Sequence, residues 1–376
     1  MSAPITADLA ANEVRERLVA HLLDHLGSMQ VTGDEAPLTS DLEEHYLAKG
    51  ETVVRVGDSL VVGAPDADDA RPMVALVGHL DVVPPTADDR EPRVEMRPDG
   101  EVVVGRGSSD MKAGNVIAMD LFADAELRAS AEWAMCLVLY AREEGPEQDN
   151  ELADVLEAVL WLDKVDLAVV LEPTDGDVQV GCLGSVNALV TITGKQAHSA
   201  RPWHGHSALD KALPLLAALA AREPVAVDVD GVAYKDVVNV TQAWTDSARN
   251  VIPGEFHLNV NFRFAPSRSA DNAVIELRAM IDDAAGLDGI GFKVVDIAPS
   301  APPRLSDGSV QSFITSVGAQ VTAKQAWTDV ARFASVGVPA LNYGPGLTGQ
   351  AHQRGEYVPI DAMLDSWTRL RAFLAG

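Results

Sequence analysis

The chain has 376 residues, of which 47% are hydrophobic, and a formal net charge of −27. This length exceeds what a single hydrophobic core usually organises, so two domains are expected. The acidic balance argues against a surface for nucleic acid or for an anionic membrane. No apolar run reaches the length of about 18 residues that a membrane-spanning helix requires, so no membrane partner is expected.

The N-terminal residues and the two cysteines both favour a cytoplasmic location. Residues 1–11 contain neither the basic region nor the continuous apolar stretch of a secretory signal. Cys136 and Cys182 lie in apolar, strand-like surroundings, where buried free thiols are more typical than a disulfide. The sequence therefore predicts a cytoplasmic protein.

Apolar periodicity in the first half predicts helices that alternate with buried strands. Four apolar residues at helical spacing indicate a helix over 12–26, on which His21 and His25 are interpreted as surface histidines. Gly57 followed by Asp58 is typical of a hairpin turn. The other elements expected in this half are helices over 39–48, 112–128 and 151–162, and strands over 51–62, 74–77, 133–141 and 165–171.

The pattern changes after Asp175, because the next strands alternate apolar and polar residues as a half-buried antiparallel sheet does. Strands are expected over 184–194, 237–243 and 255–264, and helices over 207–222 and 270–285. We interpret this block as a small α+β domain, 184–297, inserted between two parts of the first domain, 1–183 and 298–376. The last part is expected to hold a helix over 310–317, a polar turn over 328–333, a strand over 338–343 and a helix over 360–374.

Metal-binding side chains stand where three of the apolar strands end. Each of these side chains alone could equally be a solvated residue at a strand end or an Asp that caps a helix. Three apolar strands that all end in such residues favour a metal-binding or catalytic site. The carboxyl ends of parallel strands meet at one edge of a sheet, where α/β proteins bind ligands. Two Gly-rich loops, 105–114 and 344–352, contribute further candidates. The full set is His79, Asp81, Asp110, Glu143, Glu144, Glu172 and His352.

The residue types in this set point to a catalytic metal centre. Two imidazoles with several carboxylates and no thiolate suit zinc, or cobalt or manganese in its place, whereas a structural zinc site usually uses Cys. The carboxylates suffice for two ions about 3.5–4 Å apart that share a bridging carboxylate and a water. Asp81, two residues after His79, can orient the imidazole. Metals that acidify a water beside a glutamate predict hydrolysis of an amide or peptide bond.

The chain resembles a known superfamily, the co-catalytic zinc amidohydrolases, which includes carboxypeptidase G, aminoacylase and acetylornithine deacetylase. The matching motifs are 78–84, 105–114, 143–145, 172–174 and His352. Within the superfamily, segments 197–201, 261–266 and 327–333 resemble the succinyl-diaminopimelate desuccinylases of actinobacteria. The resemblance implies an α/β fold, with a mixed-sheet, zinc-peptidase-like catalytic domain and an inserted α+β, ferredoxin-like domain that serves as lid and dimerisation domain.

The resemblance also implies roles for the candidate residues. One zinc is expected on His79 and Glu172, the second on Glu144 and His352, with Asp110 bridging both ions. Glu143 is expected to be the general base, Asp81 to orient His79, and the peptide bond after Asp110 to be cis. A homodimer through the lid domains is implied, in which His198 reaches the partner's active site and stabilises the oxyanion.

An acidic protein needs local cations to bind a substrate that carries carboxylates. Arg263 and Arg332 are the best candidates, because the guanidinium fork binds a carboxylate with two hydrogen bonds, and Asn250 is a polar partner. The resemblance implies that the substrate is a small N-acyl amino acid, N-succinyl-LL-2,6-diaminopimelate. Acetylornithine, a dipeptide, or a non-catalytic metal-binding scaffold are the alternatives. The acidic segment 145–150 departs from the family pattern and can reshape the approach to the site.

Overall fold

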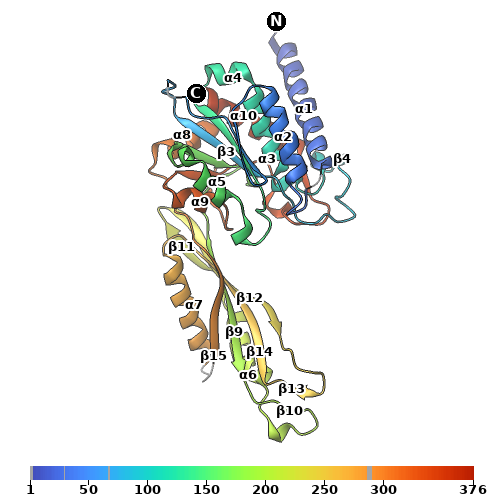
Figure 1. The fold of residues 1–376 in the computed structure, drawn as a ribbon, viewed down its shortest axis with the longest axis vertical. Coiled ribbons are helices and arrows are strands. Elements are labelled where there is room, and N and C mark those ends of the chain that lie inside the picture. Colours follow the sequence, from blue (N-terminus) through green and yellow to red (C-terminus); the bar gives the residue numbers. More distant parts are fainter. Residues whose placement is uncertain (1–2, 29, 67, 286–289) are drawn as a thin grey trace. The chain divides into compact units, whose positions relative to one another are not determined.

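The computed structural model describes residues 3–28, 30–66, 68–285 and 290–376. The chain divides into two compact units (Figure 1). Unit 1 comprises Met1–Val180, Arg304–Thr322 and Arg332–Gly376, and unit 2 comprises Gly181–Pro303 and Ala323–Ala331. This division concerns compact units, and the inserted domain expected over 184–297 stays a prediction. None of the described helices combines the length and apolar character that crossing a bilayer requires.

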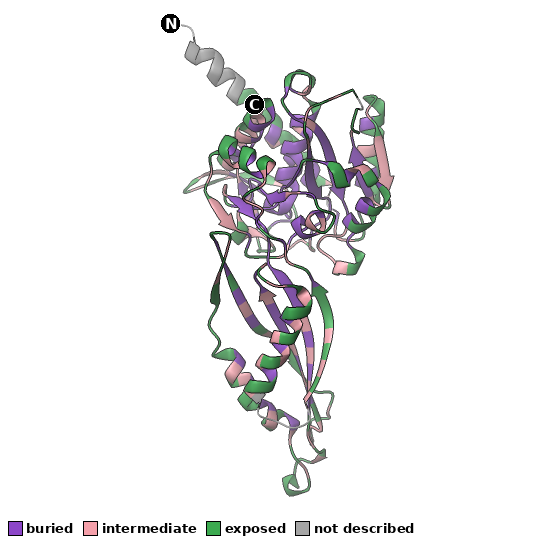
Figure 2. Ribbon diagram, turned by 90° about the vertical axis from the view of Figure 1, so that its left-hand side faces the viewer, coloured by how far each residue is buried: buried purple, intermediate pink, exposed green. Residues whose placement is uncertain are grey.

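Unit 1 is built around an eight-stranded mixed sheet in the order β1-β2-β6-β3-β7-β17-β8-β16. Its strands are β1 (Val53–Val56), β2 (Ser59–Val62), β3 (Met73–His79), β6 (Ala134–Tyr140), β7 (Leu167–Val170), β8 (Val178–Val180), β16 (Val321–Ala323) and β17 (Ala340–Asn342). Strands β6, β3, β7 and β17 run parallel, whereas β2 and β8 pair antiparallel with their neighbours. The parallel strands read as continuous apolar runs because both faces are buried (Figure 2).

Helices cover this sheet, and α1, α3 and α10 also contact one another. The helices outside the inserted block are α1 (Ala3–Gly27), α2 (Ala36–Ala48), α3 (Ala113–Ala123), α4 (Ala125–Ser130), α5 (Leu152–Ala158), α8 (Gly308–Val317), α9 (Val330–Ser335) and α10 (Ile360–Ala375). The single helix predicted over 112–128 is wrong, because Asp124 is extended and its carboxylate caps α4 by accepting from the Leu127 amide. The turn predicted over 328–333 is also wrong, since α9 begins at Val330.

A three-stranded antiparallel sheet, in the order β18-β5-β4, was not expected from the sequence. It is formed by β4 (Arg93–Arg97), β5 (Gly100–Val104) and β18 (Tyr357–Pro359). Tyr357 pairs with Val104, so the end of β5 lies beside a segment more than two hundred residues later in the chain. This pairing fixes the loop after β5 against the loop before β18.

Unit 2 contains a five-stranded antiparallel sheet in the order β11-β12-β14-β9-β15, with α6 and α7 packed on one face. The elements are β9 (Gly184–Thr193), β10 (Ala197–His198), α6 (Ala208–Ala220), β11 (Val225–Val229), β12 (Val232–Trp244), β13 (Val251–Ile252), β14 (Glu255–Phe264), α7 (Ala270–Ala285) and β15 (Ile290–Ala298). Alternate residues of β9, from Val186 to Ile192, face the helices and form the core with Leu215 and Leu277. The mixed sheet of unit 1 and this α+β unit together confirm the predicted α/β fold class.

The interpretation of His25 as a surface histidine is wrong. His25 lies on the side of α1 that packs into unit 1 and is 5% exposed, and its Nε2 has no hydrogen-bond partner among the described residues. Burial, followed by the charge of Lys112, holds the pKa of His25 well below its ordinary value of 6.5. The periodicity of residues 12–26 predicted that α1 packs through one apolar stripe. In the structure α1 contacts three elements, namely α3, α10 and β5.

Replacing His25 by Gln should flatten the pH dependence of stability. The folded-state pKa is lower than the unfolded-state pKa, so the neutral imidazole is tolerated above pH 6.5 and stability falls as pH drops below it. Thermal unfolding between pH 7.5 and 5 should show the native chain losing up to about 1.4 kcal/mol per pH unit more than His25→Gln. An equal slope in both proteins would contradict the assignment. His206→Gln, at an exposed histidine, is the control and should keep the native slope.

Candidate metal centre

The carboxyl edge of the parallel strands gathers the predicted ligands. His79 is the last residue of β3, and Glu143, Glu144 and Glu172 follow the neighbouring strands β6 and β7. Three groups, each with its ligand atoms within 4.8 Å of one another, are brought together there. They are His79 with Asp110 and Glu172, His79 with Glu143 and Glu144, and Asp110 with Glu144 and His352. The structure therefore assembles all six predicted ligand and base residues.

Asp110 lies between the two imidazoles. Its Oδ1 is 3.4 Å from His79 Nε2, and its Oδ2 is 3.6 Å from His352 Nε2. His352 Nε2 also lies 2.8 Å from Glu144 Oε2. One carboxylate that presents a separate oxygen to each imidazole has the placement that a bridging ligand requires.

Asp81 contacts His79 through its backbone, not through its carboxylate as the sequence suggested. The Nδ1 atom of His79 is 3.0 Å from the Asp81 carbonyl oxygen and 3.6 Å from Asp81 Oδ1. A carbonyl only accepts, so Nδ1 carries the hydrogen, and in the neutral ring Nε2 has its lone pair for a metal. The Asp81 carboxylate instead accepts from the backbone amides of Glu143, at 3.1 Å, and Glu144, at 3.0 Å. It thus aligns the two glutamates that follow β6.

The negative charge of the clustered carboxylates favours cations at this site. The hydrogen bond that His352 donates to Glu144 and the charge of Asp110 raise the pKa of His352 to about 9. Burial lowers the pKa of His79, but the Asp110 hydrogen bond and the charges of Glu143 and Asp81 outweigh it and hold the pKa well above the ordinary value. Without metal, protons on the imidazoles offset the carboxylates. The donor set of imidazoles and carboxylate oxygens, without thiolate, fits two divalent ions that would offset them more fully.

A buried carboxylate that sequence reasoning missed supports the loop of Asp110. Glu356, just before β18, accepts hydrogen bonds from this loop, which begins after β5 and contains the short turn η1 (Ser108–Lys112), where Asp110 and Met111 have non-helical backbone angles. Burial raises the pKa of Glu356 to about 7, while the N–H donors that face it favour the charged form. The peptide bond between Asp110 and Met111 is cis, as the family resemblance implied.

The predicted substrate-binding and oxyanion residues lie in both units. In unit 1, Arg332 Nη2 donates to Glu147 Oε1 at 3.0 Å and to the Glu147 carbonyl at 2.9 Å. In unit 2, Arg263 lies on the helix-free face of the sheet, where its Nε donates to Asn261 Oδ1 at 3.1 Å. His198 and Asn250 are exposed on unit 2, near the short β10 and β13 pair. Glu147, the partner of Arg332, belongs to the acidic segment 145–150 that departs from the family pattern.

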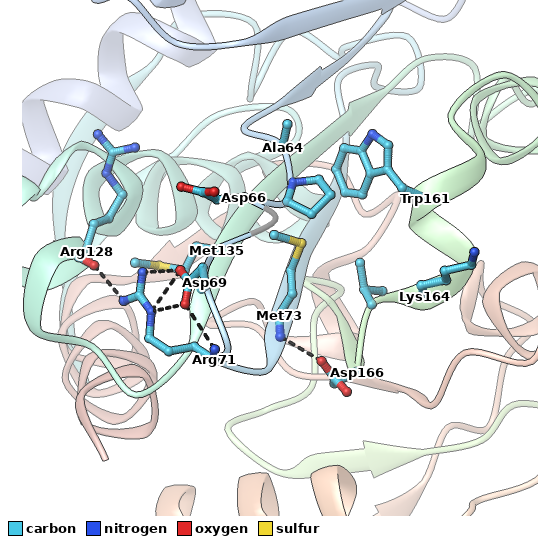
Figure 3. A pocket seen from close by; sticks show the side chains of 13 residues that line it. Ala64, Asp66, Asp69, Arg71, Met73, Arg128, Met135, Trp161, Lys164 and Asp166 are labelled. Carbon is cyan, nitrogen blue, oxygen red and sulfur yellow. Dashed lines mark hydrogen bonds and ion pairs between the residues drawn. The ribbon is translucent and has the colours of Figure 1, made fainter.

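A cavity of about 380 Å³ lies at the opposite ends of the same parallel strands, where β3 and β6 begin (Figure 3). Several of its charged groups are already engaged, since Arg71 pairs with Asp69 and the Met73 amide donates to Asp166. No imidazole lines it. The clustered ligands therefore lie at the carboxyl edge, where α/β sheets bind ligands, and not in this cavity.

Residues 75–375 match the model of Peptidase family M20/M25/M40. The chain belongs to this family. A succinyl-diaminopimelate desuccinylase of Corynebacterium glutamicum is 36% identical over 304 residues, 80% of each chain. A Mycobacterium tuberculosis protein named as a candidate succinyl-diaminopimelate desuccinylase, DapE, is 34% identical over 345 residues, 91% of this chain and 93% of its own. The protein is a metal-dependent amide hydrolase, as the sequence predicted.

Solved structures support the fold. A tripeptidase of Staphylococcus aureus superposes with a TM-score of 0.76 at 19% identity and covers 96% of this chain and 98% of its own. A Bacillus subtilis protein described as a dinuclear metal binding peptidase from the M20 family superposes with a TM-score of 0.64 at 15% identity, over 96% and 98% of the two chains. These likenesses confirm the zinc-peptidase-like architecture that the resemblance implied.

Divalent metal should stabilise the folded protein, because ions bound to the cluster remove the repulsion among its carboxylates. A thermal unfolding scan with zinc in thousandfold excess over its Kd should show a gain of about 4 kcal/mol over chelator-treated protein. In Asp110→Asn, which loses the charge between the imidazoles, the gain should shrink. Asp99→Asn, in an exposed turn, should retain it. A native protein that unfolds identically with zinc and with chelator would contradict the metal centre.

Proposed function

We propose that the protein cleaves N-succinyl-LL-2,6-diaminopimelate to succinate and LL-2,6-diaminopimelate, in the biosynthesis of diaminopimelate and lysine. The observation that carries this proposal is the identity of 34–36% to the two actinobacterial relatives of that name, over most of the chain. The cluster at the carboxyl edge of the sheet supplies what the hydrolysis needs, because it brings together both imidazoles and the four carboxylates predicted as ligands or base.

The cluster would hold two zinc ions, or cobalt or manganese in their place. His79 and Glu172 would bind one ion, Glu144 and His352 the other, and Asp110 would bridge them. This division follows the grouping of the side chains, in which Asp110 is common to the Glu172 group and the His352 group. When bound, such ions acidify a water molecule and polarise the scissile carbonyl.

Glu143 would be the general base. Its neighbour Glu144 is 2.8 Å from His352 and is assigned to the second ion site. Glu143 is therefore left to take a proton from water and to return it to the leaving amine. Asp81 would position this pair through the two backbone amides that its carboxylate accepts from.

Unit 2 would serve as the lid and dimerisation domain. Strand β11 pairs only with the beginning of β12, from Val232 to Asp236. The rest of β12 has no partner on that edge among the described strands, and an open edge favours pairing with another chain. Leu209 and Leu213 of α6 are 39% and 55% exposed, one helical turn apart. We propose that a second copy covers this edge and this apolar stripe, and that His198 then stabilises the oxyanion in the partner's site.

Arg263 and Arg332 would bind the carboxylates of the substrate, with Asn250 as a polar partner. Arg263 is half-buried and hydrogen-bonded to a neutral side chain, Asn261, so its charge is available to an anion. Arg332 is paired with Glu147, and a substrate carboxylate would have to replace that partner. The two buried free thiols, Cys136 and Cys182, agree with the proposed cytoplasmic location.

Parallel hydrolysis assays test the substrate. The zinc-loaded protein should cleave N-succinyl-LL-2,6-diaminopimelate with a higher kcat/KM than acetylornithine or a neutral dipeptide, because only the first substrate offers carboxylates on both sides of the scissile amide. Succinate release and free-amine formation should be equal. A ratio that favours acetylornithine or the dipeptide would replace the desuccinylase assignment by that of a related deacylase or dipeptidase.

Replacing Glu143 by Ala should separate catalysis from metal binding. The variant should keep two ions per chain by metal analysis but lose at least about a thousandfold in kcat, because base and metal act as a unit. Glu157→Ala, at an exposed position of α5, is the control and should keep native turnover. Near-native turnover of Glu143→Ala would reject the mechanism, and absence of turnover in the native protein would favour a metal-binding scaffold.

A further inference from the structure

One buried carboxylate joins the two loops that carry Asp110 and His352. Glu356 is 1% exposed and lies four residues after His352. Its Oε1 accepts from the backbone amides of Ser109, at 2.9 Å, and Asp110, at 3.0 Å. Its Oε2 accepts from the backbone amide of Gly107, at 2.9 Å, and from Arg106 Nη1, at 3.1 Å. Both oxygens are thus occupied by donors from the loop after β5.

The loop depends on this carboxylate for the direction of its backbone. Three amide N–H groups within four consecutive residues point to one side chain, so moving any of them leaves a buried donor unsatisfied. The carbonyl of the same residue, Glu356, accepts from the Gly105 amide at 3.0 Å. Because Asp110 itself donates to Oε1, its backbone is fixed at the residue that would bridge the ions.

Glu356 can be compared with a second buried carboxylate, Asp89, because both pair with Arg106. Arg106 is 2% exposed and lies between two carboxylates, since its Nη2 donates to Asp89 Oδ2 at 3.0 Å. Asp89 is fully buried and also accepts from Thr86 and from the Gly355 amide. Both carboxylates neutralise the same guanidinium, but only Glu356 accepts from the amides of 107–110. Removing either acid therefore breaks a buried ion pair, and removing Glu356 alone also frees the Asp110 backbone.

We propose that Glu356 is a positioning residue for the metal pair. It sets the Asp110 backbone and thereby the separation of Asp110 from His352, whose Nε2 is 3.6 Å from Asp110 Oδ2. This inference rests on the proposed two-metal site, in which Asp110 must reach both ions at once. A bridging ligand tolerates less displacement than a terminal one, because a shift toward one ion is a shift away from the other.

Other contacts hold the loop well enough for variants to fold. The Ser109 hydroxyl donates to the Tyr357 carbonyl at 2.7 Å and accepts from the Leu347 amide at 3.1 Å. Strands β5 and β18 pair next to it. Glu356→Gln is nearly isosteric and keeps one oxygen acceptor, but it turns an N–H₂ group toward donors. Its effect should therefore fall on the precise position of Asp110 more than on the fold.

The experiment compares zinc affinity in metal-free Glu356→Gln and Asp89→Asn by competition with a chromophoric chelator. Glu356→Gln should bind the zinc pair about 10- to 100-fold more weakly than the native protein, the loss typical of side chains that orient metal ligands. Asp89→Asn should stay within about threefold, well below that range, although its unfolding temperature should fall as well. Equal losses of zinc affinity in both variants would assign the effect to the buried ion pair and overturn the proposal.

A second variant keeps the test decisive if Glu356→Gln folds poorly. Glu356→Asp retains the charge beside Arg106 but shortens the reach to the amides of 107–110, so its zinc affinity should also fall. Native affinity in a folded Glu356→Asp or Glu356→Gln would overturn the inference and leave the proposed function intact. Conversely, a native protein that binds two zinc ions but does not cleave the succinyl substrate would overturn the substrate and leave the role of Glu356 standing.

Discussion

Repulsion among clustered carboxylates is the constraint on which the site depends. Asp110, Glu143, Glu144 and Glu172 converge with two imidazoles at one edge of a sheet, in a chain that is already strongly acidic. Such a cluster is stable only when positive charge enters it. The raised pKa of His352, held up by Glu144 and Asp110, shows that the field attracts cations. Two divalent ions would satisfy this demand better than two protons, since each brings twice the charge.

The scaffold delivers the ligands by two different means. Strands β3, β6 and β7 are neighbours and parallel, so residues at their ends meet, and the Asp81 carboxylate aligns Glu143 and Glu144 through their backbone amides. Asp110 and His352 instead stand on loops, where backbone position has to be fixed by other contacts. The pairing of β5 with β18 brings these loops together, and Glu356 and Ser109 bind them to each other. The loop ligands therefore depend on long-range hydrogen bonds alone, whereas strand pairing already brings the other ligands together.

This difference explains which parts of the site the sequence could predict. The ends of β3, β6 and β7 were predictable because an apolar run followed by His or Glu is a local signal. Glu356 was not, because it stands in a polar loop before a three-residue strand that ends in Pro359 and has no measurable periodicity. The spacing of His79 and Asp81 predicted proximity, but it could not show that the carbonyl oxygen and not the carboxylate contacts the ring.

The two candidate arginines differ in what a substrate carboxylate would gain from them. At Arg332 an incoming carboxylate exchanges places with Glu147, so one ion pair is lost for the one that forms. At Arg263 the side-chain hydrogen-bond partner is the neutral Asn261, and burial lowers the pKa of the guanidinium by more than the charge of Asp296 raises it. A carboxylate there forms a new ion pair at a poorly hydrated cation. Under the proposed function, Arg263 would therefore contribute more to substrate binding, and Glu147 would make Arg332 selective for anions able to displace a carboxylate.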